Sequence, residues 1–277
     1  MAFTAGPFHP LRVLRPGKDT WKVKVRVLRQ WEMFPAGEPS KPYALNLVLI
    51  DSEGVKIEAY IKKNYLSKFK GEFSEGNVYK ITYFDVSENS GIFRASEHFC
   101  KIFFNHRTRV AQEHSDVIPN ICLSLKNSTY IDATMGESDF LIDFIGLVTH
   151  VLRERQYVKD GRVTRKIELD LIDDKGMVKC ALFGNYVDIV TEFLAIDRNG
   201  FPVMVVQFAK IKSFRGDIVI QNVMRGTKLL WNLDIPEVAS FRNGLAVHGV
   251  DLNVPLGVID GGVPIVPLED EFVLKWI

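Results

Sequence analysis

The groups in this chain that could act chemically are cations and aromatic rings placed in turns between strand-like segments. Residues 153–166 contain six Lys or Arg against two Asp or Glu. Phe93 and Phe214 each lie in a short Gly-containing turn next to arginine, and Phe183 ends an apolar run just before a helical one. Cations follow phosphates and exposed rings stack on bases, so this combination is typical of a surface for single-stranded nucleic acid.

Residues expected at a catalytic or metal site are not grouped in this sequence. The six histidines are scattered without the paired spacing of metal ligands, and no phosphate-binding Gly-rich loop or nucleophile elbow occurs. Cys100, Cys122 and Cys180 are odd in number and far apart, which argues against a disulfide framework and a zinc site. We therefore expect no catalysis, no metal and no cofactor, in a reducing compartment.

Two aspartates recur, Asp51 and Asp173, each in a turn between two apolar runs and each followed three residues later by glycine. In such a turn the carboxylate bonds to the backbone and glycine supplies positive φ. Turn chemistry explains both aspartates, so we predict a structural role for them and not a catalytic one.

The elements around these turns repeat about one domain length apart. Strands are expected at 21–28, 44–50, 55–61, 77–84 and 92–104, with a helix at 62–73. The second copy has strands at 141–152, 165–172, 177–183, 202–208 and 217–223, with a helix at 185–195. The order β-β-β-α-β-β is typical of the five-stranded Greek-key barrel called the OB-fold, so we predict an all-β protein of two tandem OB-folds.

This repeat sets the expected domain organisation: a first OB-fold at 1–105, a polar linker at 106–120, a second OB-fold at 121–236 and an extended Gly- and Pro-containing tail at 237–277. Charge differs along the chain. Residues 1–110 carry a balance of +7, residues 111–235 carry −2 and residues 236–277 carry −4. A basic front half is compatible with a polyanionic partner, although a Lys-rich surface alone can produce it. No apolar run reaches the roughly 18 residues that a membrane helix needs.

The second copy resembles the second single-stranded-DNA-binding domain of the large subunit of replication protein A. The resemblance lies in Leu141-Ile142-Asp143-Phe144-Ile145-Gly146, Leu171-Ile172-Asp173-Asp174-Lys175-Gly176, Ala181-Leu182-Phe183-Gly184 and Asn232-Leu233-Asp234-Ile235-Pro236-Glu237. The first copy is similar to the preceding domain of that large subunit, and its Arg26–Glu32 segment resembles divergent plant members. The resemblance covers about residues 11–240.

In that family two aromatic rings per domain stack on bases. The resemblance implies that Phe183 and Phe214 take these roles in the second domain and Phe93 one of them in the first. The other first-domain position falls on Tyr60 or Lys62, and a lysine there would remove one stacking contact. The candidate interface comprises Lys24, Arg29, Trp31, Phe93, Arg94, Arg153, Arg155, Arg165, Lys166, Phe183, Lys212, Phe214 and Arg215.

The resemblance implies a nuclear protein that binds single-stranded DNA with little sequence preference, as in replication, repair or recombination. The family's N-terminal barrel and its C-terminal barrel with zinc ribbon are not recognised here, so we expect a monomer that does not form the standard heterotrimer. Two alternatives remain open: a protein-interaction scaffold whose groove has decayed, and a single-stranded RNA binder.

Overall fold

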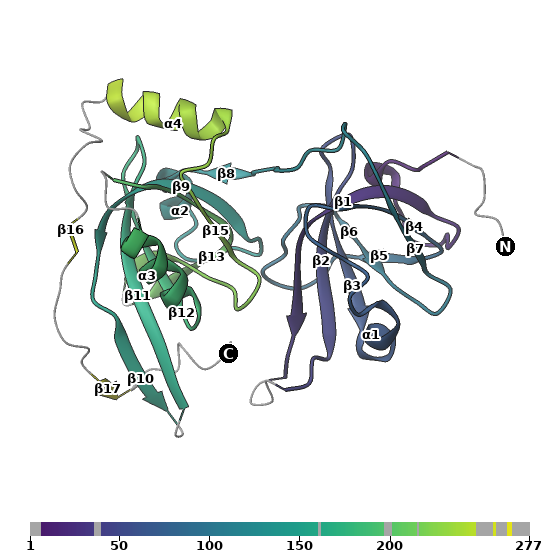
Figure 1. Ribbon diagram of the computed structural model, residues 1–277, viewed down its shortest axis with the longest axis horizontal. Coiled ribbons are helices and arrows are strands. Elements are labelled where there is room, and N and C mark those ends of the chain that lie inside the picture. The colour runs from purple at the N-terminus through teal and green to yellow at the C-terminus, as the bar shows by residue number, and fades with distance from the viewer. Residues whose placement is uncertain are drawn as a thin grey trace. The chain divides into compact units, whose positions relative to one another are not determined.

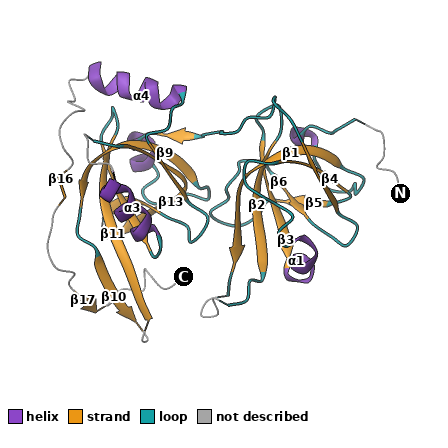
Figure 2. Cartoon of the chain, in the orientation of Figure 1, coloured by secondary structure: helices purple, strands orange, loops and turns teal. Residues whose placement is uncertain are grey.

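The computed structural model describes residues 7–35, 40–159, 162–196, 201–214, 216–247, 257–258 and 265–267. The chain divides into two compact units, Met1–Cys122 and Leu123–Ile277. Both units consist mainly of β-strands with short helices (Figure 1, Figure 2). The predicted fold class, all-β with two OB-type barrels, is confirmed.

The first unit has one sheet that curves round a single apolar core. Its elements are η1 (Leu11–Val13), β1 (Lys22–Met33), β2 (Ala44–Ile50), β3 (Lys56–Lys62), α1 (Lys63–Phe69), β4 (Val78–Thr82), β5 (Asp85–Glu88), β6 (Cys100–Phe103) and β7 (Arg109–Glu113). The alternation in β1 places Val23, Val25 and Val27 in the core, as the period-two pattern predicts. The helix α1 is shorter than expected, and its Phe69 is buried in the same core.

The first barrel closes because β4 and β5 act as one bent strand. β1 pairs with β2 and β4, β2 with β3, β3 with β6, and β6 with β5. The bend falls at Tyr83, whose φ is 59°. The Tyr83 carbonyl accepts a hydrogen bond from Thr108 Oγ1 at 3.0 Å, which ties the bend to the segment that follows β6.

The second unit repeats this barrel with additions at both ends. Its elements are β8 (Leu125–Lys126), α2 (Ser128–Ala133), β9 (Ile142–Val151), β10 (Arg155–Lys159), β11 (Arg162–Ile172), β12 (Met177–Phe183), α3 (Tyr186–Ile196), β13 (Val203–Phe214), β14 (Asp217–Gln221), β15 (Lys228–Trp231), α4 (Pro236–Val247), β16 (Gly257–Val258) and β17 (Ile265–Pro267). The ring runs β9–β11–β12–β14–β13 and returns to β9.

The bend of the first barrel recurs in the second. The long strand β13 replaces β4 and β5, and its register shifts beside Phe208, whose φ is 58°. The Phe208 carbonyl accepts a hydrogen bond from Thr227 Oγ1 at 2.9 Å, the counterpart of the bond from Thr108 to Tyr83. The two units therefore share a buried polar contact as well as a strand order.

The structure places Asp51 and Asp173 in the predicted turns. Asp51 Oδ1 accepts from the backbone N–H groups of Glu53 and Val55, both at 3.0 Å. Asp173 Oδ1 accepts from those of Lys175 and Gly176, both at 2.8 Å. The other oxygen does something that turn chemistry does not predict: it accepts the N–H of the helix that precedes each barrel, at Leu11 and Ser128 respectively, at 2.7 Å.

The two turn glycines serve different purposes. Gly54 has φ +78°, as expected for this turn. Positive φ was expected at Gly176 too, but there the glycine is needed for space, because a Cβ would lie 3.3 Å from Ser128 Oγ.

The expected linker at 106–120 is largely structured. Residues Arg109–Glu113 form β7, which pairs with β4 and is the counterpart of β15 on β13. The buried Arg26 then fastens the chain beyond β7: its guanidinium donates to the carbonyl of Ser115 at 3.0 Å and to that of Ile118 at 2.8 Å. Because these contacts depend on residues about 90 positions away, no local pattern reveals them.

The expected extended tail begins with a helix. In α4, Val238 and Leu245 are buried and Phe241 is partly buried against Ile145 and Val205, at the spacing of one helical face. Beyond it, β16 pairs with β9 and β17 with β10, both parallel. The remaining tail residues, 248–256, 259–264 and 268–277, lie outside the described residues.

Candidate nucleic-acid interface

The side chains that face away from the first core can be read from the strand register. Leu47 and Leu49 of β2 point into the core, so the alternate residues Asn46 and Val48 point outward. Paired residues of neighbouring strands share a face of the sheet. The outward face therefore carries Arg29 and Trp31 of β1, Glu58, Tyr60 and Lys62 of β3, and Lys101 and Phe103 of β6.

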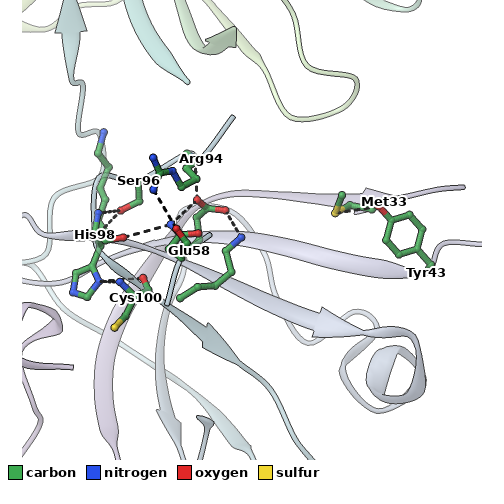
Figure 3. Close-up of polar contacts among 11 residues, drawn as sticks. Met33, Tyr43, Glu58, Arg94, Ser96, His98 and Cys100 are labelled. Atoms are coloured by element: carbon green, nitrogen blue, oxygen red, sulfur yellow. Dashed lines mark hydrogen bonds and ion pairs between the residues drawn. The ribbon is translucent and has the colours of Figure 1, made fainter. Parts of the chain in front are cut away.

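The loop 89–99 between β5 and β6 packs on this outward face through Glu58. The Glu58 carboxylate accepts from Asn89 Nδ2 at 3.1 Å and from the Ala95 backbone N–H at 2.9 Å, and it pairs with Lys101 Nζ at 2.9 Å. Figure 3 shows Glu58 at the centre of these contacts, with Arg94 and Ser96 of the loop beside it. A buried carboxylate on the middle of β3 thus fixes the loop on the candidate interface. Sequence reasoning missed it.

Phe93 and Arg94 lie in this loop, which replaces most of the strand expected at 92–104. Phe93 is half-buried with φ 58°, a conformation that a strand does not allow. Arg94 donates to the Asn89 carbonyl at 3.2 Å inside the same loop. The strand is limited to β6 because Ser96 and His98 bond to the loop and to its neighbours in place of a ladder.

The remaining first-unit candidates separate into two places. Arg29 and Trp31 lie on the half of β1 that pairs with β2, and Arg29 forms an ion pair with Glu75 at 2.9 Å. Lys24 lies on the other half, which pairs with β4, and its ammonium is 3.6 Å from Glu113 of β7. The structure therefore does not bring Lys24 to the face that carries Trp31.

The register decides between Tyr60 and Lys62. β3 and β12 are each seven residues long, and Lys62 and Phe183 end them. Tyr60 corresponds to Ala181, two residues earlier. Lys62 therefore takes the position of Phe183, and its ammonium lies 5.7 Å from the centre of the Phe103 ring on β6.

In the second unit the charged segment 153–166 is a hairpin arm, not an open loop. β10 and β11 pair from Arg155 with Lys166 to Lys159 with Arg162. Lys166 in turn pairs with Phe183 of β12. Arg155, Lys166 and Phe183 therefore lie side by side on the outward face, with Arg155 exposed at the outer edge. Arg153, also exposed, comes just before this arm.

Phe183 lies deeper than a free stacking platform would. Its side chain is 5% exposed, and the Lys166 ammonium lies 5.6 Å from the ring centre. Lys166 is also paired with Glu168 at 2.6 Å. A base that stacks on this ring must displace the lysine head, which can then move to a phosphate.

Arg165 points the other way, since consecutive residues of a strand alternate. Its guanidinium bonds to both oxygens of Glu154, at 2.6 and 2.9 Å, and to Asp188 of α3 at 2.5 Å. These bonds raise the pKa of Arg165, and the bond from Arg165 is the main cause of the lowered pKa of Glu154. Arg165 thus joins the arm to α3, and its contact with nucleic acid stays a prediction.

A lysine that sequence reasoning missed lies on the same outward face. Lys210 of β13 is 7% exposed and pairs with Gln221. Burial, followed by the nearby Lys212, lowers the pKa of Lys210 to about 8. Burial also lowers the pKa of Lys212. The alternation of Ala209 and Ile211 in the core with Lys210 and Lys212 outside was the available signal.

The other second-unit candidates lie at the tip of the β13–β14 hairpin. The Phe214 backbone pairs with Asp217 at this tip. The Phe214 side chain and Arg215 lie outside the described residues, so their roles stay predictions.

The outward faces combine cations, rings and amides, which suits binding and not bond-breaking chemistry. Among the described residues, no group of three or more His, Cys, Asp or Glu side chains could hold a metal ion. None of the helices in the described part of the chain is long and apolar enough to cross a membrane.

Comparison with known proteins adds relatives. The model of a domain of unknown function, DUF223, matches residues 12–133. A replication protein A 70 kDa DNA-binding protein of Oryza sativa subsp. japonica is 25% identical over 252 residues, covering 87% of this chain and 26% of that protein. Its counterpart in Arabidopsis thaliana is 22% identical over 255 residues, covering 89% and 41%. The chain thus spans well under half the length of these relatives.

Among solved structures, a replication protein A heterotrimer bound to ssDNA matches with a TM-score of 0.59 and 18% identity, covering 92% of this chain and 59% of the chain compared. At this identity the match supports the fold and leaves the site to be argued from the residues.

Proposed function

Because this chain is a distant homologue of the plant replication protein A 70 kDa DNA-binding subunits, we propose that it binds single-stranded DNA with little overall sequence preference. The proposal extends to a nuclear role in replication, repair or recombination, without catalysis. It concerns this chain of two barrels, which covers part of the length of those relatives.

One observation carries the proposal: each barrel has an aromatic ring with a lysine ammonium beside it on the outward face. The pairs are Lys62 with Phe103 at 5.7 Å and Lys166 with Phe183 at 5.6 Å. A ring accepts a base face whatever the base, and an ammonium next to it is placed to reach the adjoining phosphate. A single strand offers base faces and phosphates in this alternation.

The loops beside each face support the same function. In the second barrel the arm β10–β11 carries Arg155 and Lys166, and the β13–β14 hairpin carries Lys212. In the first barrel the loop 89–99 carries Phe93 and Arg94 beside β3. OB-folds bind oligonucleotides between these two connections. The balance of +7 over residues 1–110 adds long-range attraction for a polyanion.

The test is a titration of the purified chain with fluorescent oligo-dT, oligo-rU and a duplex of equal length, each at two salt concentrations. We expect oligo-dT to bind more tightly than the duplex, with affinity that falls as salt rises. Equal or tighter binding of oligo-rU would assign the site to RNA. Absence of binding to all three would contradict the proposal and favour a protein-interaction scaffold.

A further inference from the structure

A row of four outward side chains crosses the first barrel. Trp31 of β1 is opposite Asn46 of β2, and Asn46 is opposite Tyr60 of β3. Tyr60 in turn pairs with Phe103 of β6. Two residues from Tyr60 on the same face, Glu58 holds the loop 89–99. The row therefore lies next to the loop that carries Phe93 and Arg94.

Asn46 is the one polar member in the middle of this row. Its side chain is 9% exposed, Oδ1 is buried, and no group in the described part of the chain donates to that oxygen. Buried polar atoms in folded proteins are almost always hydrogen-bonded, so an amide oxygen without a donor points to a ligand. A half-turn of the amide exchanges its oxygen and nitrogen, so either can face a bound group.

Aromatic rings flank the amide on both sides. Tyr60 and Phe103 meet edge to face, with ring centres 5.9 Å apart and an angle of 64° between the planes. Trp31, on the opposite side of Asn46, belongs to the same face. Lys62 adds a cation 5.7 Å from the Phe103 ring centre. Rings, an amide and a cation are the groups that bind a base and its phosphate.

The chemistry of DNA narrows what Asn46 can bind. Phosphate and deoxyribose offer acceptors along the chain, so a donor to the amide oxygen must come from a base. Adenine presents its 6-amino donor next to a ring-nitrogen acceptor, which matches the two ends of an asparagine amide. We propose that Asn46 hydrogen-bonds the edge of a base held against Trp31 and Tyr60, and that this subsite selects adenine. The inference rests on the proposed single-stranded DNA binding.

The second barrel lacks this arrangement. The register puts Glu168 and Ala181 where the first barrel has Asn46 and Tyr60. Glu168 is already paired with Lys166 at 2.6 Å, and Gln221 takes the place of Phe103. Base selection is therefore a property of the first barrel, while the second binds without it.

The experiment compares two oligomers that stack alike. One is oligo-dA, and in the other every adenine is replaced by purine, which lacks the 6-amino group. We expect the chain to bind oligo-dA about fivefold or more tightly than the purine oligomer. Asn46→Leu should abolish the difference, and Gln221→Leu, which removes an outward amide from the second barrel, should keep it. Circular dichroism checks that both variants fold.

The outcomes separate this inference from the proposed function. Tight and equal binding of both oligomers by the unaltered chain would overturn the adenine subsite and leave DNA binding intact, whether or not Asn46→Leu folds. A folded Asn46→Leu that still prefers oligo-dA would overturn it too. Failure to bind any oligomer would overturn both proposals.

Discussion

Lys62 in the first barrel and Phe183 in the second occupy the same structural position, the last residue of a seven-residue third strand. On the neighbouring second strand, Ala44 faces Lys62 and Lys166 faces Phe183. One barrel thus presents a cation where the other presents a ring. The two units have the same fold and different means of holding a nucleotide.

Replacing Lys62 with Phe should exchange a charge interaction for a stacking one. A base–aromatic stack contributes roughly 1–3 kcal/mol, and a lost phosphate contact lowers the slope of log K against log salt by about 0.7 for a single strand. We expect Lys62→Phe to bind oligo-dT more tightly than the unaltered chain at high salt, with a smaller advantage at low salt.

The exposed neighbour Lys63 provides the control, because Lys63→Phe loses a charge without placing a ring at the strand end. If the two variants behaved alike, position 62 would not contact a base.

Phe183→Leu should lower both affinity and stability, because the ring is 5% exposed and lies beside Lys166. We expect oligo-dT affinity to fall by about fivefold or more, as for a lost stack, together with a lower melting temperature.

Phe193→Leu is the matched control. Phe193 stacks on Trp231 with ring centres 4.1 Å apart and packs against the same core, so it should lose stability and keep affinity. Loss of affinity in proportion to stability in both variants would show that Phe183 acts through the fold alone.

Arg155 and Arg165 should respond differently to alanine, although both lie on the arm. Arg155 is exposed, so Arg155→Ala should reduce the salt slope by about 0.7. Arg165 is bonded to Glu154 and Asp188, so Arg165→Ala should leave the slope unchanged and lower the melting temperature by about 1–3 °C.

The pH dependence of that stability follows from Glu154. Its pKa in the folded chain is lowered from 4.5, so the stabilisation is present above the unfolded value and is lost as pH falls through the folded one. The melting-temperature difference should therefore shrink in acid. A difference that grew in acid would contradict this ion pair.

Lys210 should make binding depend on pH. Its pKa is lowered to about 8, and a bound phosphate favours the charged form and raises it. Between pH 7 and 9 the unbound chain loses this proton, so affinity should fall as pH rises through 8, by at most about tenfold per pH unit. Titrations with oligo-dT at fixed ionic strength measure it.

Lys210→Met should flatten this dependence, whereas Lys175→Met, at the exposed turn beside Asp174, should not. A profile that Lys210→Met left unchanged would assign the titration to another group.

The sequence was sufficient to predict the parts of the fold that depend on neighbouring residues. Alternation in β1 and the turns at Asp51 and Asp173 are local patterns, and the structure has them where they were expected. β7 was not predictable because a short polar strand is defined by its partner, here β4. The helix α4 was masked by the Gly and Pro content of the residues that follow it.

The candidate site was less predictable, since it depends on which side chains three or four strands bring together. Arg155, Lys166 and Phe183 meet as the repeat suggested. Lys24 does not reach the face that carries Trp31, and Arg165 faces α3. Glu58, Lys210 and Asn46 acquire their burial from distant strands and loops, and a single sequence does not show that burial in advance.

The connection between the two barrels is short once its anchors are counted. Arg26 holds the chain at Ile118, and Asp143 accepts the Ser124 N–H at 2.7 Å, which leaves residues 119–123 between the anchored points. For so short a tether, a strand captured by one barrel meets the other at an effective concentration in the millimolar range, if it can span both. Two faces that each bind weakly can then act as one site with high avidity, and a single nucleotide preference in the first barrel can set where on a long strand the whole chain comes to rest.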